Sequence, residues 1–129
     1  MTKTVVRTDA APAPVSGAPY SQAIIAAGFV FVSGQVPVDP ATGKLVEGGV
    51  AEHTHRCFDN VAAILAEAGS GLDKLVKTSV FLHNMGDFAA MNAVYATYFP
   101  KDPPARTTVV ASPPAVGARV EIECIAVAG

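Results

Sequence analysis

The ten prolines of this sequence fall between its apolar runs and interrupt none of them. Three lie in a Pro/Ala/Gly-rich stretch over residues 10–19. The others are Pro37, Pro40, Pro100, Pro103, Pro104, Pro113 and Pro114. Because proline lacks a backbone N–H and cannot continue a helix or a central strand, these positions mark the ends of elements. The chain is therefore divided into short segments that suit single strands and helices.

Most of these segments are typical of β-strands. Residues 22–27 and 29–33 are apolar runs joined at Gly28, which predicts a β-hairpin with a tight turn. Further strands are expected at residues 4–7, 75–82, 106–111 and 120–127. Residues 37–49 are rich in turn formers and predict a surface loop.

Two segments have the apolar spacing of helices. The first begins at Val50 and ends before Gly69, the expected C-terminal stop. The second follows Asp87, which can cap its first turn, and Pro100 ends it. Its apolar face is expected to hold Phe88, Met91, Tyr95, Tyr98 and Phe99. The order of elements predicts an α+β fold in which two helices cover one face of a mixed sheet.

The composition predicts one domain, residues 1–129, that associates with further copies of itself. The length of 129 residues suits a single domain. Half of the residues are hydrophobic and the mean hydropathy is +0.37, which is high for a small domain that keeps much of its surface exposed. Since the helices cover only one face of the sheet, another copy of the chain is the expected cover for the other face.

Charge and cysteine content predict an intracellular protein that binds neither nucleic acid nor membrane. The net charge is −2 and no cluster of Lys or Arg occurs, which counts against binding to phosphates. No apolar run is long enough to span a bilayer, and the N-terminus lacks the apolar region of a signal peptide. Cys57 and Cys124 fit neither a disulfide framework nor a zinc spacing, so we expect unpaired thiols in the reducing cytoplasm.

Two charged residues are candidates for chemistry. Arg106 opens a strand directly after a Pro-Pro-Ala loop, and a guanidinium held there matches a carboxylate. The alternative is an ordinary ion pair. Glu121 and Glu123 are two residues apart on one strand and share a face, where a carboxylate could position or activate a water molecule. The alternative is a solvated strand face, which we prefer for Glu123.

Four other polar or flexible positions carry weaker signals. Ser33 and Gly34, which Gln35 follows, offer a hydroxyl and close access to the backbone, although a simple turn is the likelier explanation of this tripeptide. Tyr20 could present a phenol at a cleft or pack as an aromatic side chain. Asn92 lies beside the apolar face of the second helix, where its amide either bonds backbone or faces a cleft.

A metal site is not expected. His53 and His55 are two residues apart on a helix and point in different directions. His53 and Cys57 share a face, but two ligands without further partners make a poor zinc site. We interpret these residues as an exposed helix start.

Seven segments together resemble the RidA/YjgF family of reactive-intermediate deaminases, from about Thr4 to Val127. They are APYSQA (18–23), VSGQVPVDPATG (32–43), NVAAIL (60–65), VKTSVFL (76–82), FAAMNAVY (88–95), PARTTV (104–109) and VEIECIAV (120–127). The resemblance implies a chorismate-mutase-like fold and a homotrimer with active sites between subunits. It also implies hydrolysis of 2-iminobutanoate and 2-iminopropanoate to 2-oxo acids and ammonia. These imines and their enamine tautomers are released by PLP-dependent dehydratases, and no metal or organic cofactor is expected.

The resemblance also implies roles for individual residues. Arg106 matches the arginine that pairs with the substrate carboxylate, and Glu121 matches the glutamate that orients the attacking water. The residues that match cleft or substrate contacts are Tyr20, Ser33, Gly34, Asn92 and Thr108. Some relatives carry a cysteine at the position of Thr108, so thiol chemistry is not expected there. Two alternatives remain: a trimer that binds small carboxylates with little turnover, and RNA cleavage or translation inhibition.

Overall fold

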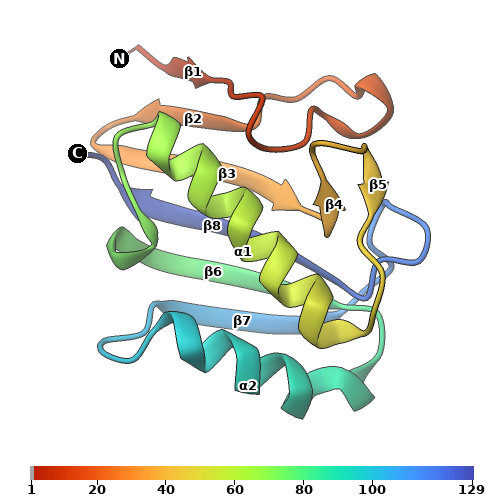
Figure 1. The fold of residues 1–129 in the computed structure, drawn as a ribbon. Helices are drawn as coiled ribbons and strands as arrows, with labels where there is room; N and C mark the ends of the chain where they lie inside the picture. The colour runs from red at the N-terminus through yellow and green to blue at the C-terminus, as the bar shows by residue number, and fades with distance from the viewer. Residues whose placement is uncertain (1) are drawn as a thin grey trace.

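The computed structural model describes residues 2–129, which form a six-stranded mixed sheet with two helices (Figure 1). The strand order is β1-β2-β3-β8-β6-β7. The strands are β1 (Thr4–Val6), β2 (Ala23–Ala26), β3 (Phe29–Gln35), β6 (Leu75–Leu82), β7 (Ala105–Val110) and β8 (Val120–Val127). Adjacent strands are antiparallel except β6 and β7, which are parallel because a helix connects them. The mixed sheet predicted from the sequence is confirmed.

The helices α1 (Val50–Glu67) and α2 (Phe88–Tyr98) lie on the same face of the sheet. Figure 1 shows α1 in front of the central strands and α2 along the edge formed by β7. The predicted start of α1 and its stop at Gly69 are confirmed, and Gly69 has a φ of +77°. Among residues 2–129, no helix is both long and apolar enough to cross a membrane.

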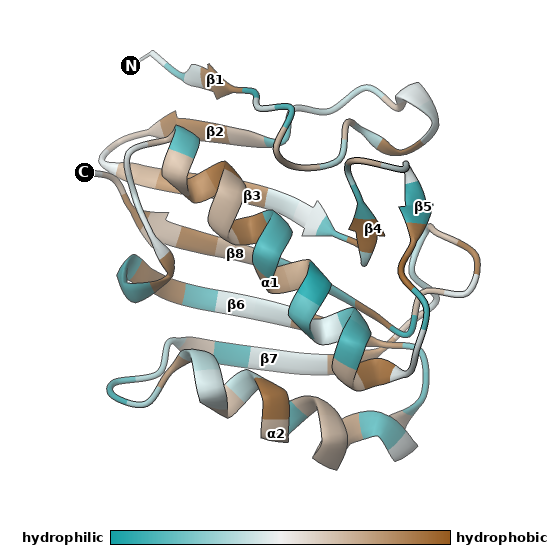
Figure 2. Cartoon of the chain, in the orientation of Figure 1, coloured by the Kyte–Doolittle hydropathy of each residue, from teal (hydrophilic) through white to brown (hydrophobic). Residues whose placement is uncertain are grey.

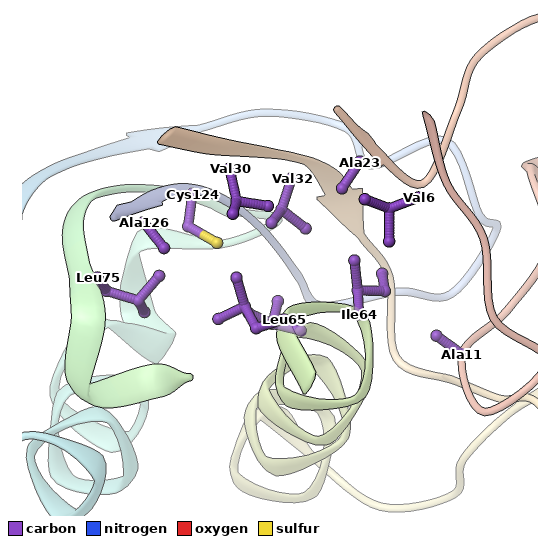
Figure 3. Close-up of a cluster of buried hydrophobic side chains, with 11 residues drawn as sticks. Val6, Ala11, Ala23, Val30, Val32, Ile64, Leu65, Leu75, Cys124 and Ala126 are labelled. Atoms are coloured by element: carbon purple, nitrogen blue, oxygen red, sulfur yellow. The ribbon is translucent and has the colours of Figure 1, made fainter. Parts of the chain in front are cut away.

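The hydrophobic core lies between the helices and the sheet. Figure 3 shows Ile64 and Leu65 of α1 pointing toward the side chains of Val30, Val32 and Cys124 on the sheet. A second buried cluster joins α1 and α2 to β6 and β8. It consists of Val50, Cys57, Phe58, Val80, Leu82, Met91, Tyr95, Val120 and Ile122. Burying such side chains contributes about 1.5–3 kcal/mol each and fixes both helices on the sheet.

The opposite face of the sheet is uncovered and carries apolar side chains beside the charged Glu121 and Glu123. Phe29, Phe31, Val109 and Val127 all point to this face and are 40–42% exposed. Figure 2 shows hydrophobic residues in β2, β8 and the first part of β3, whereas hydrophilic residues lie on turns of α1, in β5 and in parts of β6 and β7. A strand that is apolar on both faces is typical of a sheet that is covered on both sides.

Three local expectations from the sequence are wrong. Ser33, Gly34 and Gln35 do not form a turn but end β3, with a bulge between Val32 and Gln35 where β3 pairs with β8. The segment from residue 37 to residue 49 is not merely a loop, since β4 (Val38–Asp39) and β5 (Lys44–Leu45) form a small hairpin in it.

Asp87 precedes α2 but does not cap it with its side chain. A short 3₁₀ turn, Met85–Asp87, comes first, and Asn84 accepts a hydrogen bond from the N–H of Gly86 at its start. The carboxylate of Asp87 lies 3.6 Å from the guanidinium of Arg119 instead. The predicted cap is therefore wrong because Asp87 is used in a long-range ion pair.

Candidate active site

Arg106 is the second residue of β7 and lies on the face of the sheet that the helices cover. It is in register with Thr78 of β6, which is completely buried on that face. Its guanidinium carbon lies 4.8 Å from the centre of the Tyr95 ring and 5.7 Å from the centre of the Phe88 ring. No carboxylate of residues 2–129 lies within ion-pair distance. The ordinary ion pair considered from the sequence is therefore not formed within the described chain.

Two buried polar atoms without hydrogen-bond partners accompany Arg106. Thr108 is two residues further along β7 and shares its face, and its Oγ1 has no partner within residues 2–129. Asn92 lies on α2 between the two aromatic residues that contact Arg106, and its Oδ1 is likewise unpartnered. An unsatisfied buried group costs roughly 1–3 kcal/mol, so such atoms are typical of a place that a ligand or water completes. We call Asn92, Arg106 and Thr108 the helix-side cluster.

Glu121 belongs to a second group of predicted residues. Its carboxylate lies over the backbone of Gly34, because a Cβ built there would be 2.5 Å from Oε2 of Glu121. The adjacent Ser33 donates a hydrogen bond from its hydroxyl to the carbonyl of Ser21, at 2.6 Å. Tyr20, the residue before Ser21, is 40% exposed, and its hydroxyl accepts a hydrogen bond from the N–H of Val15. We call Tyr20, Ser33, Gly34 and Glu121 the open-face cluster.

Arg106 and Thr108 of the helix-side cluster and Glu121 of the open-face cluster lie on opposite faces of the sheet. Arg106 is in register with Thr78, whereas Glu121 is in register with Phe81, three residues further along β6. Since side chains alternate between faces along a strand, an odd separation places the two on different sides. Arg106 and Glu121 of one chain therefore cannot act on the same small molecule.

Burial changes the acid–base properties of Glu121. Its pKa is raised above the usual value for glutamate, mainly by desolvation and also by the negative charge of Glu123 nearby. Glu123 itself is exposed, in agreement with the solvated position preferred for it. A carboxylate with a raised pKa is a stronger base toward water than an exposed one.

The histidines do not form a metal site. His53 is buried rather than exposed, so its expected place in an exposed helix start is wrong. Its Nδ1 accepts a hydrogen bond from the N–H of Arg119, so its Nε2 donates to the carbonyl of Val46. His55 is exposed, and its Nδ1 lies 2.6 Å from the hydroxyl oxygen of Tyr98. Within residues 2–129 no group of three potential ligands is placed to hold a metal ion.

The cysteines are buried and unpaired, as expected. Cys57 donates to the carbonyl of Gln35, and burial raises the pKa of its thiol strongly. Burial, together with Glu123, raises the pKa of Cys124 to about 12. Neither thiol is suited to act as a nucleophile at neutral pH.

A hollow of about 780 Å³ lies between the N-terminal loop and the β4–β5 hairpin. Tyr20 lines it, but neither Arg106 nor Glu121 does. It therefore lacks both charged groups that the predicted chemistry needs.

The sequence did not identify the aromatic contacts of Arg106 as part of the site. Phe88 and Tyr95 were assigned to the apolar face of a helix, and the structure shows that this face also holds the guanidinium. A signal was present, because two aromatic residues seven positions apart on a helix precede a strand whose second residue is an arginine. The contact depends on how α2 packs against β7, which spacing alone does not specify.

Known proteins resemble this chain over nearly its whole length. Residues 9–128 match the family described as endoribonuclease L-PSP. A RutC family protein of Pyrococcus abyssi is 46% identical and covers 98% of both chains. The 2-iminobutanoate/2-iminopropanoate deaminase of Mus musculus is 43% identical, over 97% of this chain and 91% of the relative.

A solved structure of a Rid family protein, YyfA from Yersinia pestis, has the same fold. It superposes with a TM-score of 0.91 at 42% identity and covers 98% of this chain and 99% of its own. The segments that suggested the family thus lie within an alignment that includes both the helix-side and the open-face cluster. The chain belongs to the RidA/YjgF family of Rid proteins.

Proposed function

We propose that this protein hydrolyses small reactive 2-imino acids, such as 2-iminobutanoate and 2-iminopropanoate, to 2-oxo acids and ammonia. The observation that carries the proposal is the guanidinium of Arg106, which has no carboxylate partner in residues 2–129. Thr108 on the same face of β7, and Asn92 on the helix that contacts the guanidinium, each have an unsatisfied buried oxygen. The name of the Mus musculus relative, at 43% identity, supports the same substrate class.

The helix-side cluster suits the constant part of such a substrate. Arg106 would bind the carboxylate through two parallel hydrogen bonds, which fixes the orientation of the adjacent C2 atom. Asn92 Oδ1 and Thr108 Oγ1 would accept hydrogen bonds from N–H groups of the substrate or from ordered water, which satisfies both buried atoms. The exposed part of the Phe88 ring offers an apolar contact for a short alkyl side chain.

The open-face cluster suits activation of water. We propose that Glu121 takes a proton from a water molecule as the water oxygen attacks C2 of the imine. The imine nitrogen takes up the proton that Glu121 removed, which gives a carbinolamine. The carbinolamine nitrogen then takes up the proton of the new hydroxyl group as the C–N bond breaks, so ammonia leaves and the 2-oxo acid remains. No electrons are gained or lost, and the imine carbon is already electrophilic, so positioning of substrate and water is the main requirement.

A complete site then requires two copies of the chain, because Arg106 and Glu121 of one copy lie on opposite faces. We propose a homotrimer in which Arg106 of one subunit and Glu121 of the next line the same cleft. The uncovered apolar face around Phe29, Phe31 and Val127 supports such an assembly. A closed ring of three would form three equivalent sites.

A coupled assay tests the proposal. A PLP-dependent threonine dehydratase generates 2-iminobutanoate, and formation of 2-oxobutanoate is timed with and without the protein. We expect acceleration that Arg106→Ala abolishes. Arg7→Ala is the matched control, since Arg7 is exposed and pairs only with the exposed Asp9. Full activity of the Arg106 variant would contradict the proposal.

Two other functions remain to be distinguished. A sensor that binds 2-oxo acids through Arg106 would show saturable binding without faster imine hydrolysis in this assay. Ribonuclease activity is suggested by the description of the family, endoribonuclease L-PSP. The net charge of −2 and the lack of a Lys/Arg cluster count against RNA binding.

A further inference from the structure

We propose that Tyr95, anchored by Thr78, positions the guanidinium of Arg106 for a carboxylate. This inference rests on the proposed function, since it concerns how the same arginine binds its substrate. Tyr95 and Thr78 are buried, so neither is assigned a direct contact with the substrate.

The ring of Tyr95 is held from several sides. Its hydroxyl lies 2.7 Å from the hydroxyl of Thr78, and this hydrogen bond is buried. Phe58 of α1 packs edge-on against the ring, with 5.5 Å between ring centres, and Phe99 packs at 4.9 Å. Tyr95 is only 6% exposed. The ring is therefore a fixed surface, in contrast to a side chain that adjusts to its neighbour.

The anchor and the arginine are adjacent on the sheet. Thr78 of β6 is in register with Arg106 of β7, so the strand that holds the Tyr95 hydroxyl is also the strand that pairs with the arginine. The guanidinium carbon lies 4.8 Å from the centre of the Tyr95 ring. Any shift of α2 relative to the sheet would thus alter both the Tyr95–Thr78 hydrogen bond and the contact of Tyr95 with Arg106.

A contact with ring faces suits an arginine that must bind an anion. It stabilises the positive charge without using an acidic partner, which would compete with the substrate. No side-chain hydrogen bond found in residues 2–129 uses the guanidinium, so its N–H donors remain available for a carboxylate. A guanidinium that is already oriented loses less side-chain entropy on binding, and this lowers the KM.

Tyr95 is not suited to proton transfer itself. Burial raises its pKa above the usual value for tyrosine, so the phenol stays protonated at neutral pH. Phe88, the other ring that Arg106 contacts, is 39% exposed and less constrained. Positioning is therefore assigned to Tyr95 and its anchor.

Steady-state kinetics of imine hydrolysis test the proposal on the full chain. We expect Tyr95→Leu to raise the KM about tenfold and to leave kcat within about twofold, since a desolvated cation–π contact is lost while the water-activating group is intact. Tyr98→Leu is the matched control, because Tyr98 lies on the same helix and stacks on Phe58 at 4.4 Å but does not contact Arg106. We expect both constants of the control to stay within about twofold of wild type.

Two further variants keep the packing and remove only the anchor. Tyr95→Phe and Thr78→Val should each raise the KM about threefold, and the double variant should raise it no more than either one, because both act through one hydrogen bond. The inhibition constant of 2-oxobutanoate should rise in parallel, whereas binding of its uncharged amide should not change. These variants decide the question if Tyr95→Leu does not fold.

The possible outcomes separate the inference from the function on which it rests. If Arg106→Ala is fully active, the proposed function itself is wrong. If Arg106→Ala is inactive but the Tyr95 and Thr78 variants match Tyr98→Leu, only the positioning role is wrong. A loss of kcat at constant KM in the Tyr95 variants would also overturn it.

Discussion

The carboxylate of Glu121 occupies the space that a side chain at Gly34 would need. A Cβ at Gly34 would come within 2.5 Å of Oε2 and 2.9 Å of the carboxyl carbon of Glu121. From the sequence, Gly34 was expected to give a ligand access to the backbone. In the structure, the carboxylate of Glu121 from the same chain lies over the backbone of Gly34, which is in the bulge of β3.

Gly34→Ala should therefore displace the Glu121 carboxylate. The clash is with the end of a flexible side chain, so we expect the fold to lose less than about 1 kcal/mol while kcat falls about tenfold or more. The KM should change little because Arg106 is untouched. Gly49→Ala is the control, since a Cβ there would lie 3.8 Å from its nearest neighbour. An unchanged kcat for Gly34→Ala would show that the position of this carboxylate does not matter.

The pH dependence of kcat should report the raised pKa of Glu121. Activity should fall as pH decreases through this pKa, because the protonated carboxyl cannot accept a proton from water. Glu123 contributes to the rise, so Glu123→Gln should shift the acidic limb of the profile to lower pH. The measurement is kcat across the acidic range for both proteins. If the acidic limb does not move, the group that controls it is not Glu121.

Glu121→Gln should abolish activity and increase stability at neutral pH. The raised pKa means that the folded state binds this proton more tightly than the unfolded state does. The free energy of unfolding therefore decreases as pH rises from the unfolded pKa to the folded one, and the amide variant avoids this loss. Denaturant unfolding should show the advantage of Glu121→Gln at pH 7 and a smaller one near pH 3. Equal stabilities at pH 7 would contradict a buried charge at this position.

The sequence predicted the elements that have strong local patterns and missed features that depend on contacts with distant parts of the chain. The bounds of β6 and β8 agree with the expected strands, and Ala27 and Gly28, both with positive φ, form the expected tight turn. The expected exposure of His53 was wrong because its ring is hydrogen-bonded to the backbone of Val46, which is in a loop, and of Arg119, which is 66 residues away in the chain.

The same limit applies to the site. The sequence identified Arg106 and Glu121, but whether they share a face depends on the register of β6 with β7 and with β8. Register between distant strands is set by packing over the whole sheet, and a shift of one residue would move Arg106 to the other face. The sequence therefore predicted the chemistry of Arg106 and Glu121, but it did not predict that they lie on opposite faces of the sheet.

The uncovered sheet face should control assembly. Phe31→Asp would place a charge among the exposed apolar side chains of Phe29 and Val127, so we expect loss of the proposed trimer and of imine hydrolysis, with far-UV circular dichroism unchanged. Val116→Asp is the control, because Val116 is 98% exposed at a loop. Sedimentation analysis distinguishes monomer from trimer. A Phe31→Asp protein that remains a trimer would show that another surface joins the subunits.

Two inactive variants should restore activity when they are combined. Arg106→Ala chains retain Glu121, and Glu121→Gln chains retain Arg106, so a mixed trimer can form one intact site between neighbouring subunits. Random mixing of equal amounts puts both variants together in about three quarters of the trimers. Each mixed trimer has one intact site of three, so we expect about a quarter of wild-type activity.

Co-expression of the two variants with different affinity tags allows the mixed trimers to be purified and assayed. The control is a mixture of Arg106→Ala chains carrying the same two tags, which should stay inactive. If the mixed trimers are as inactive as the control but keep the oligomeric state of the wild type, Arg106 and Glu121 do not serve a common site. Because the two residues lie on opposite faces of one sheet, restored activity can arise only from a cleft that two copies share.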